Sequence, residues 1–216
     1  IDKVFAQSEL DKTRLEELGA KNIEVIGNIK LAKLPEKKLD LLKPSGILIT
    51  AASTHENEES LVLNSYKKEF GRLVIVPRHP ERFEKVNALI SEFVKNNNLT
   101  YHRYSQKEDF ESDIILVDKM GILNDIYAIS DVVILGGAFE KIGGHNPVEP
   151  AFFGCKIISG KNIFNQKSLF ECIKNYYLIE NDELKSYLEK IKNLEKPVLT
   201  KAGTIEPIIK EINRWL

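Results

Sequence analysis

The chain has 216 residues, and its 31 lysines and arginines are set against 32 aspartates and glutamates, which gives a net charge of −1 at pH 7. This balance excludes the strong positive electrostatic potential that attracts a protein to nucleic acid or to an anionic membrane. The length allows one large core, or a domain with a fragment of another. The sequence contains no apolar run as long as a membrane span.

The cysteines and histidines do not indicate a metal site. Cys155 and Cys172 lack ligand spacing and are too few for a disulfide framework, so we expect both to be small buried residues of a cytosolic protein. The four histidines lack ligand spacing as well. We therefore expect neither a metal nor a cofactor.

The first residues predict a strand, a helix and a second strand. Residues 3–7 and 23–26 are short apolar runs. Between them, Ser8 is a suitable N-cap for a helix and Gly19 a suitable left-handed stop. Residues 35–45 contain two prolines and a lysine-rich middle, which is typical of a linker with at most one short helix.

From Gly46 onward, apolar runs alternate with helical periodicity. Strands are expected at residues 46–51, 72–76, 100–104, 114–117, 132–135, 156–158 and 176–179. Helices are expected at residues 56–69, 80–96, 122–129, 147–153, 166–174, 183–193 and 204–216. This alternation predicts an α/β fold, namely a Rossmann-like parallel sheet with helices on both faces.

The glycine-rich stretch after strand 132–135 is the best candidate for a ligand site. Four glycines occur among residues 136–144, and ligands bind in open α/β sheets at the carboxyl ends of the strands. Asn146, Pro147 and Glu149 then have the spacing of a helix capping box, which is the plain structural interpretation. Pro150, however, removes the first hydrogen bond of that helix. Because functional sites are where local rules are broken, we favour a ligand site.

Another predicted strand ends before Pro77, Arg78 and His79. A guanidinium beside the helix start at Pro80 suits a phosphate, because its charged hydrogen bonds add to the backbone donors of the helix end. By itself, this motif fits an arginine paired with a surface carboxylate better. A packed or capping role for His79 is as plausible as a ligand contact.

Two further loops follow strands 46–51 and 114–117. In the first, Ser53 or Thr54 is a suitable helix cap, and the carboxylates that follow suit the positive end of the helix dipole. In the second, Gly121 allows a tight turn between Met120 and Ile122, which is a weak signal for contact with a nucleobase.

The glycine-rich stretch also carries a resemblance to a known family. Gly-Gly-His-Asn-Pro-Val-Glu-Pro (143–150) and Val-Pro-Arg-His-Pro-Glu-Arg-Phe (76–83) resemble the donor-binding half of bacterial 3-deoxy-D-manno-octulosonic acid (Kdo) transferases. Shorter matches follow in the family's order: Ala-Gln-Ser-Glu (6–9), Gly-Asn-Ile-Lys (27–30), Ser-Thr-His-Glu (53–56), Met-Gly (120–121) and Phe-Asn (164–165).

The resemblance implies a domain organisation. The family has a GT-B fold with two Rossmann-like halves, and this chain is similar to the second. We expect residues 1–34 to be the tail of a missing acceptor-side domain, 35–45 a linker, 46–203 the donor-binding domain and 204–216 a crossover helix. Because the chain begins with Ile1, we expect it to be part of a longer enzyme.

The resemblance also implies roles for the candidate residues. Arg78, with Pro77 and Asn146, is expected at the donor phosphate. Glu149 is expected at the ribose, and Met120, Gly121 and Ile122 at the base. In the family the position of Ile122 is usually acidic, so contact here is expected through the backbone.

Ser53, Thr54, His79 and His145 are candidate sugar contacts. The implied donor is CMP-Kdo, with CMP as the nucleotide that remains. The implied acceptor is a lipid A precursor, held by the missing domain at the cytoplasmic face of the inner membrane, with membrane contact only through absent sequence. The general base is expected in the missing domain, so this fragment is expected to be soluble and inactive by itself. A sugar-nucleotide epimerase, a transferase with a uridine donor, and a non-enzymatic nucleotide-binding module remain alternatives.

Overall fold

The computed structural model of the chain describes residues 2–32, 35–200 and 203–215. It divides into two compact units, one formed by Pro35–Val198 and the other by the two ends of the chain, Ile1–Leu34 and Leu199–Leu216. The sequence predicts breaks after residues 34, 45 and 203, whereas the structure joins residues 35–45 to the larger unit. Among the described helices, none has the length and apolarity that a membrane span requires.

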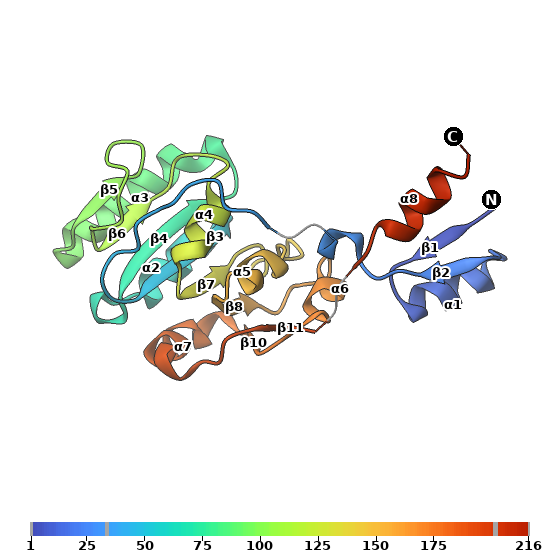
Figure 1. The fold of residues 1–216 in the computed structure, drawn as a ribbon. Helices are drawn as coiled ribbons and strands as arrows, with labels where there is room; N and C mark the ends of the chain where they lie inside the picture. Colours follow the sequence, from blue (N-terminus) through green and yellow to red (C-terminus); the bar gives the residue numbers. More distant parts are fainter. Residues whose placement is uncertain (1, 33–34, 201–202, 216) are drawn as a thin grey trace. The chain divides into compact units, whose positions relative to one another are not determined.

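A seven-stranded parallel sheet forms the centre of the larger unit (Figure 1). Its strands lie in the order β10-β8-β7-β3-β4-β6-β5. They comprise β3 (Leu48–Thr54), β4 (Arg72–Pro77), β5 (Tyr101–Arg103), β6 (Ile114–Leu116), β7 (Val132–Leu135), β8 (Lys156–Gly160) and β10 (Tyr176–Ile179). The order along the sheet changes direction between β3 and β7, which makes this position the topological switch point. The predicted Rossmann-like parallel sheet is confirmed.

The helices of the larger unit follow the strands. They are α2 (Glu58–Ser65), α3 (Phe83–Asn97), α4 (Leu123–Ile129), α5 (Val148–Phe152), α6 (Lys167–Phe170) and α7 (Leu184–Glu189), with 3-10 turns η2 (Lys68–Phe70), η3 (Pro80–Arg82), η4 (Asn181–Glu183) and η5 (Ile191–Asn193). The helix predicted over 166–174 is wrong at its end. There, β9 (Ile173–Lys174) pairs with β11 (Val198–Leu199), a partner too distant in sequence for local periodicity to reveal.

Helices cover both faces of the sheet because the strands are apolar on both. Successive residues of a strand point to opposite faces. Ile49 of β3 therefore joins a core layer with residues of α2, α3 and α7. Its neighbour Leu48 joins a second layer with Ile126 and Ile129 of α4. Both Leu48 and Ile49 are completely buried.

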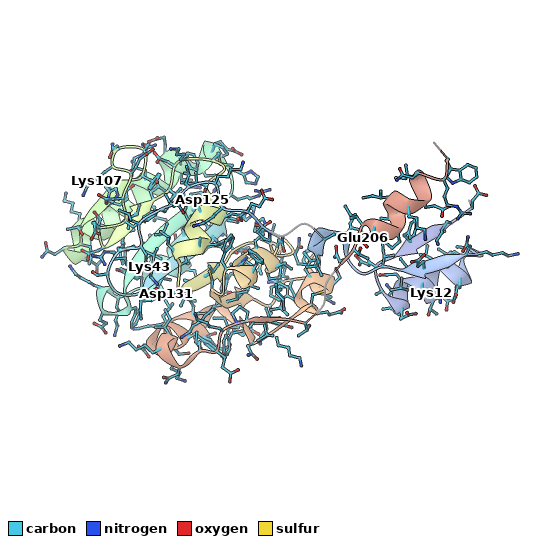
Figure 2. The ribbon with its side chains drawn as sticks, viewed as in Figure 1. Lys12, Lys43, Lys107, Asp125, Asp131 and Glu206 are labelled. Atoms are coloured by element: carbon cyan, nitrogen blue, oxygen red, sulfur yellow. The ribbon has the colours of Figure 1, made fainter. Side chains whose placement is uncertain are left out.

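Two carboxylates, the buried Asp125 and the partly exposed Asp131, anchor the segment 35–45 to the larger unit. Asp125 of α4 is 1% exposed, and its Oδ1 accepts the N–H groups of Lys38 at 2.5 Å and of Leu39 at 2.8 Å. Further along, the Nζ of Lys43 lies 2.5 Å from the carboxylate of Asp131, and the two side chains lie together in Figure 2. The segment contains no helix, and these contacts explain why it packs on the larger unit.

The smaller unit contains two parallel strands, β1 (Val4–Ala6) and β2 (Ile23–Val25), connected by α1 (Glu9–Glu17). As predicted, Ser8 caps α1 by accepting the N–H of Asp11 at 3.1 Å, and Gly19 follows the helix with φ +87°. The unit also includes η1 (Ile29–Leu31) and α8 (Glu206–Ile212). Beyond α8, Trp215 is 72% exposed.

Candidate functional site

The candidate site lies at the switch point, where the loops after β3, β4 and β7 meet. Ala52 of β3 is in register with Leu135 of β7, and Thr54 of β3 with Pro77 of β4. The carboxyl ends of these three neighbouring strands therefore lie at one edge of the sheet. Ligands bind at this place in open α/β sheets.

Ser53 bends the end of β3 and brings it close to the glycine-rich loop. Its φ is +54°, a left-handed conformation that is uncommon outside glycine, and the pairing of β3 with β4 shifts register at this residue. A β-carbon at Gly136 would lie 2.6 Å from the Ser53 carbonyl oxygen, so the approach requires glycine. Ser53 is 7% exposed, which leaves little of its side chain open to a ligand.

Glu58 connects the loop after β3 to the loop after β7. It is 1% exposed, and it accepts the N–H groups of Gly137 at 2.8 Å, His55 at 2.9 Å and Phe139 at 3.2 Å. Burial raises the pKa of this carboxyl, while the N–H bonds oppose the rise. The backbone donors of the glycine-rich loop are therefore directed at an internal carboxylate.

Glu59 forms a second buried network beside the first. Its carboxylate is paired with both terminal nitrogens of Arg82, at 2.6 and 2.9 Å, and it accepts the hydroxyl of Thr54 at 2.7 Å. Thr54 is 1% exposed. The resemblance implied that Thr54 contacts the sugar, but its hydroxyl is buried and already donated, so we drop it from the candidates.

Arg78 is a cation at this edge that remains available. Its backbone N–H donates to Thr54 at 3.0 Å, which holds the residue directly after the buried Pro77. The side chain is exposed, and among the described residues the guanidinium has no hydrogen-bond or ion-pair partner. The sequence motif by itself favoured an Arg78 paired with a surface carboxylate. Among the described residues, the structure shows no such pair.

Three histidines gather next to Arg78. The Nε2 atoms of His55 and His145 lie 2.8 Å apart, and their rings are stacked at 5.1 Å with an angle of 7°. The exposed His79 presents its ring edge-on to His55 at 5.5 Å. Burial, followed by the charge of His79, lowers the pKa of His55. Burial, followed by His55 and Arg78, lowers the pKa of His145 to about 4, so this imidazole is neutral at physiological pH.

Asn146 and Glu149 contact each other at the start of α5. Asn146 accepts the N–H of Val148 at 3.0 Å and donates its amide to Glu149 at 3.1 Å. The predicted capping box does not form, because Pro147 occupies the N-cap position without a side-chain cap bond, and Asn146 and Glu149 contact each other only through their side chains. Glu149 is half-buried and lies close enough to Tyr127 to add to the rise that burial causes in the pKa of that phenol. A carboxylate has about four acceptor positions, so it remains able to accept ribose hydroxyls.

The loop between β6 and α4 contains the residues expected at the base. Met120 is 54% exposed, and Gly121 has φ +83°. Ile122, in contrast, is 5% exposed and packs in the core layer with α4. Its side chain is therefore unable to lie against a nucleobase, and the expected contact of Ile122 is limited to its backbone.

A cavity of about 490 Å³ lies at the opposite edge of the sheet, at the amino ends of β7 and β8. Its lining includes Lys43, Asp131, Lys156 and Lys192. Two of these lysines are engaged, Lys43 with Asp131 and Lys156 with the backbone carbonyls of η5. Since ligands of open α/β sheets bind at the carboxyl ends of the strands, we keep the candidate site at the switch point.

The structure brings together residues that the sequence analysis left outside the site. His55 was noted only among the histidines without metal-ligand spacing and within the matched Ser-Thr-His-Glu (53–56). Glu58 and Glu59 were noted only as favourable charges at a helix start. Arg82 appeared only within the resemblance. In the described parts of the chain, no group of three or more His, Cys, Asp or Glu side chains is placed to hold a metal ion.

Comparison with known proteins identifies relatives of this region. No family model matches the sequence. A bifunctional glycosyltransferase/methyltransferase from Fusobacterium nucleatum is 34% identical over 96% of this chain and 38% of its own length. Kdo transferases from Haemophilus influenzae and Aquifex aeolicus are both 32% identical, over 80% and 98% of this chain and 44% and 56% of their own lengths. The chain thus spans about half the length of the curated relatives it matches, or less.

Solved structures agree with the sequence comparison. The C-terminal CMP-Kdo binding domain of WaaA from Acinetobacter baumannii is similar with a TM-score of 0.59 and 28% identity, over 68% of this chain and 80% of that one. Anabaena HepE, solved with UDP-glucose, has a TM-score of 0.51 at 12% identity, over 89% of this chain and 53% of its own, which shows the fold alone. This chain therefore belongs to the Kdo transferase family, and in fold it is similar to the C-terminal domain of WaaA.

Proposed function

We propose that this chain is the donor-binding domain of a glycosyltransferase that moves Kdo from CMP-Kdo to a lipid A precursor in lipopolysaccharide synthesis. The observation that carries the proposal is Arg78, an exposed guanidinium without a partner among the described residues, at the switch point of a domain similar to a CMP-Kdo binding domain. Charge-assisted bonds from a guanidinium are suited to the donor phosphate.

The remaining roles are those that the resemblance implies. Glu149 would accept the ribose hydroxyls, with Asn146 holding it in place at 3.1 Å. Met120 and Gly121 would border the base. Arg78 would stabilise the negative charge that develops on the departing phosphate, which is electrostatic stabilisation of the transition state.

The catalytic base and the acceptor site would lie outside this chain. The two buried carboxylates of α2 at this edge are engaged in the structure, since Glu58 accepts backbone N–H groups and Glu59 is paired with Arg82. Neither is placed to activate an acceptor hydroxyl. We expect the chain by itself to bind donor without transferring it, and the whole protein to act at the cytoplasmic face of the inner membrane, with membrane contact through sequence outside this chain.

Calorimetric titration with CMP and UMP tests the assignment. We expect a preference for CMP, and a loss of binding in Arg78→Ala and Glu149→Ala. Arg14→Ala is the matched control, because Arg14 lies on α1 in the other unit and is exposed. Each lost charge-assisted bond should weaken binding by about 1.5 to 3 kcal/mol. Equal affinity for both nucleotides, or variants that bind like the control, would contradict the residue assignments.

Two alternatives predict different outcomes. An epimerase or a transferase with a uridine donor would bind UMP at least as tightly as CMP. A non-enzymatic nucleotide-binding module would bind nucleotide but show no transfer in any form of the protein, including one with the acceptor-side domain restored.

A further inference from the structure

The His55–His145 pair is the feature of the site that phosphate and nucleoside recognition leave unexplained. Its two Nε2 atoms lie 2.8 Å apart, so one ring donates its Nε2–H and the other accepts it. A neutral imidazole carries one proton, so the accepting ring holds its proton on Nδ1 and the donating ring has an unprotonated Nδ1. The pair is thus able to take up one further proton without breaking the bond between the rings.

The charged groups that face this pair come from the elements after β3 and β4. They are Glu58 and Glu59 of α2, Arg78 and His79 after β4, and Arg82 of η3. The carboxylate of Glu58 accepts the backbone N–H groups of His55, Gly137 and Phe139. Arg82 and Glu59 neutralise each other at 2.6 Å. Arg78 has no such partner in the described part of the chain, whereas the carboxylate of Glu58 is held by backbone N–H groups. The guanidinium of Arg78 is therefore the charge beside the pair that stays open to a ligand. Burial and the charge of Arg78 lower the pKa of both histidines, which keeps the pair neutral. A bound anion would act in the opposite direction and favour the protonated pair.

A donor of the proposed kind carries two anionic groups. In CMP-Kdo the phosphate is a diester with a single negative charge, and the sugar acid adds a carboxylate. Arg78 supplies one cation for the two anions. A carboxylate buried beside the phosphate needs a second cationic partner, because an unpaired buried charge is costly.

Building on the proposed function, we propose that the His55–His145 pair recognises the carboxylate of the donor sugar, and that it takes up one proton from solvent as the donor binds. The proton is added to the unprotonated Nδ1 of the donating ring. Both Nδ1 atoms then carry protons and the pair carries one positive charge, which complements a carboxylate. No covalent bond forms or breaks in this step.

Titration calorimetry at neutral pH, in two buffers with different ionisation enthalpies, measures protons taken up on binding. The two ligands are CMP-Kdo and the methyl ester of CMP, which has the same single phosphodiester charge and no carboxylate. We expect the chain to take up about one proton per CMP-Kdo bound and none with the methyl ester. Affinity for CMP-Kdo alone should fall as the pH rises above neutral.

His145→Gln and His55→Gln each remove the pair. We expect both variants to lose the proton uptake. Their affinity for CMP-Kdo should fall by a factor of up to about ten, and their affinity for the methyl ester should stay unchanged. His102→Gln is the matched control, since His102 lies on β5 and contacts Ser112 at 2.8 Å. Two variants are used so that a folding defect in one, visible by circular dichroism, does not decide the outcome.

The outcomes separate this inference from the proposed function. Binding of both ligands without proton uptake would overturn the inference and leave the donor site intact. An equal loss of affinity for both ligands in the two variants would also overturn it. The pair would then have only a structural role in the site. If the wild-type chain binds neither ligand, the proposed function fails and the inference fails with it.

Discussion

Gly137 holds the glycine-rich loop against the ring of His145, and Gly137→Ala tests whether this contact positions the histidine. Gly137 has φ +75°, and a β-carbon there would lie 2.8 Å from Cδ2 and 3.0 Å from Nε2 of His145. Gly154 provides a matched control. Its φ is +74°, and a β-carbon there would meet no heavy atom within 4 Å beyond its chain neighbours. Only the first alanine therefore displaces an imidazole.

Both variants lose stability because alanine is unfavourable in the left-handed conformation. Only Gly137→Ala also loses stability through the displacement of His145. A non-glycine residue in the left-handed region costs about 1 to 2 kcal/mol, and this applies to both. Gly137→Ala adds about 0.5 to 1.5 kcal/mol for moving His145 off its rotamer. It adds a similar amount, about 0.5 to 1.5 kcal/mol, for the lost hydrogen bond to His55. We expect Gly137→Ala to be less stable than Gly154→Ala by about 1 to 3 kcal/mol.

Urea denaturation followed by circular dichroism measures the difference between the two unfolding free energies. The imidazole signals of His145 in NMR spectra report its position directly, and we expect them to shift in Gly137→Ala and to stay unchanged in Gly154→Ala. Equal free energies, together with unchanged His145 signals in both variants, would refute the view that Gly137 positions this ring.

Three further predictions concern stability. Arg82→Met leaves the buried Glu59 carboxylate without its cation, so we expect a loss of about 3 to 5 kcal/mol in urea denaturation; a loss below 1 kcal/mol, the usual size for an exposed pair, would contradict the burial argument. Asp125→Ala leaves two backbone N–H groups of the segment 35–45 without their acceptor, so trypsin should cleave that segment faster, and unchanged cleavage would argue against the anchor. Because the pKa of His145 is lowered from 6.5 to about 4, the folded state binds fewer protons in that window. Stability present at neutral pH should therefore fall as the pH drops from 6.5 towards 4, and His145→Gln should flatten the profile measured by urea denaturation.

The fold was predictable wherever local sequence determines local structure. Val132–Leu135 is a run of apolar residues before glycines, and it forms the buried strand β7 as expected. The end of β3 was not predictable in this way, since the strand extends to Thr54 beyond the expected residue 51. Ser53 adopts its left-handed conformation where its carbonyl meets Gly136, a contact between segments far apart in the sequence.

The site was predictable only in part, for a related reason. Arg78 and Glu149 lie directly after a strand or at a helix start, positions that local patterns indicate. The pairing of His55 with His145 depends on β3 lying next to β7, and strand order is a property of the whole sheet. The buried network of Glu58 was missed because a carboxylate in the first turn of a helix also suits the helix dipole in solvent.

The contacts of Glu58 indicate that the glycines of the loop after β7 have a structural role and do not bind phosphate through their backbone. In a dinucleotide-binding fold, such a loop brings backbone N–H groups to a phosphate. Here the N–H groups of Gly137 and Phe139 are already donated to Glu58, at 2.8 and 3.2 Å. A ligand phosphate would have to displace a buried carboxylate and would repel it on approach. The glycines therefore serve the close packing of the loop against Ser53 and His145. Under the proposed function, the recognition of the phosphate would then fall to a side chain, and Arg78 is the one we propose.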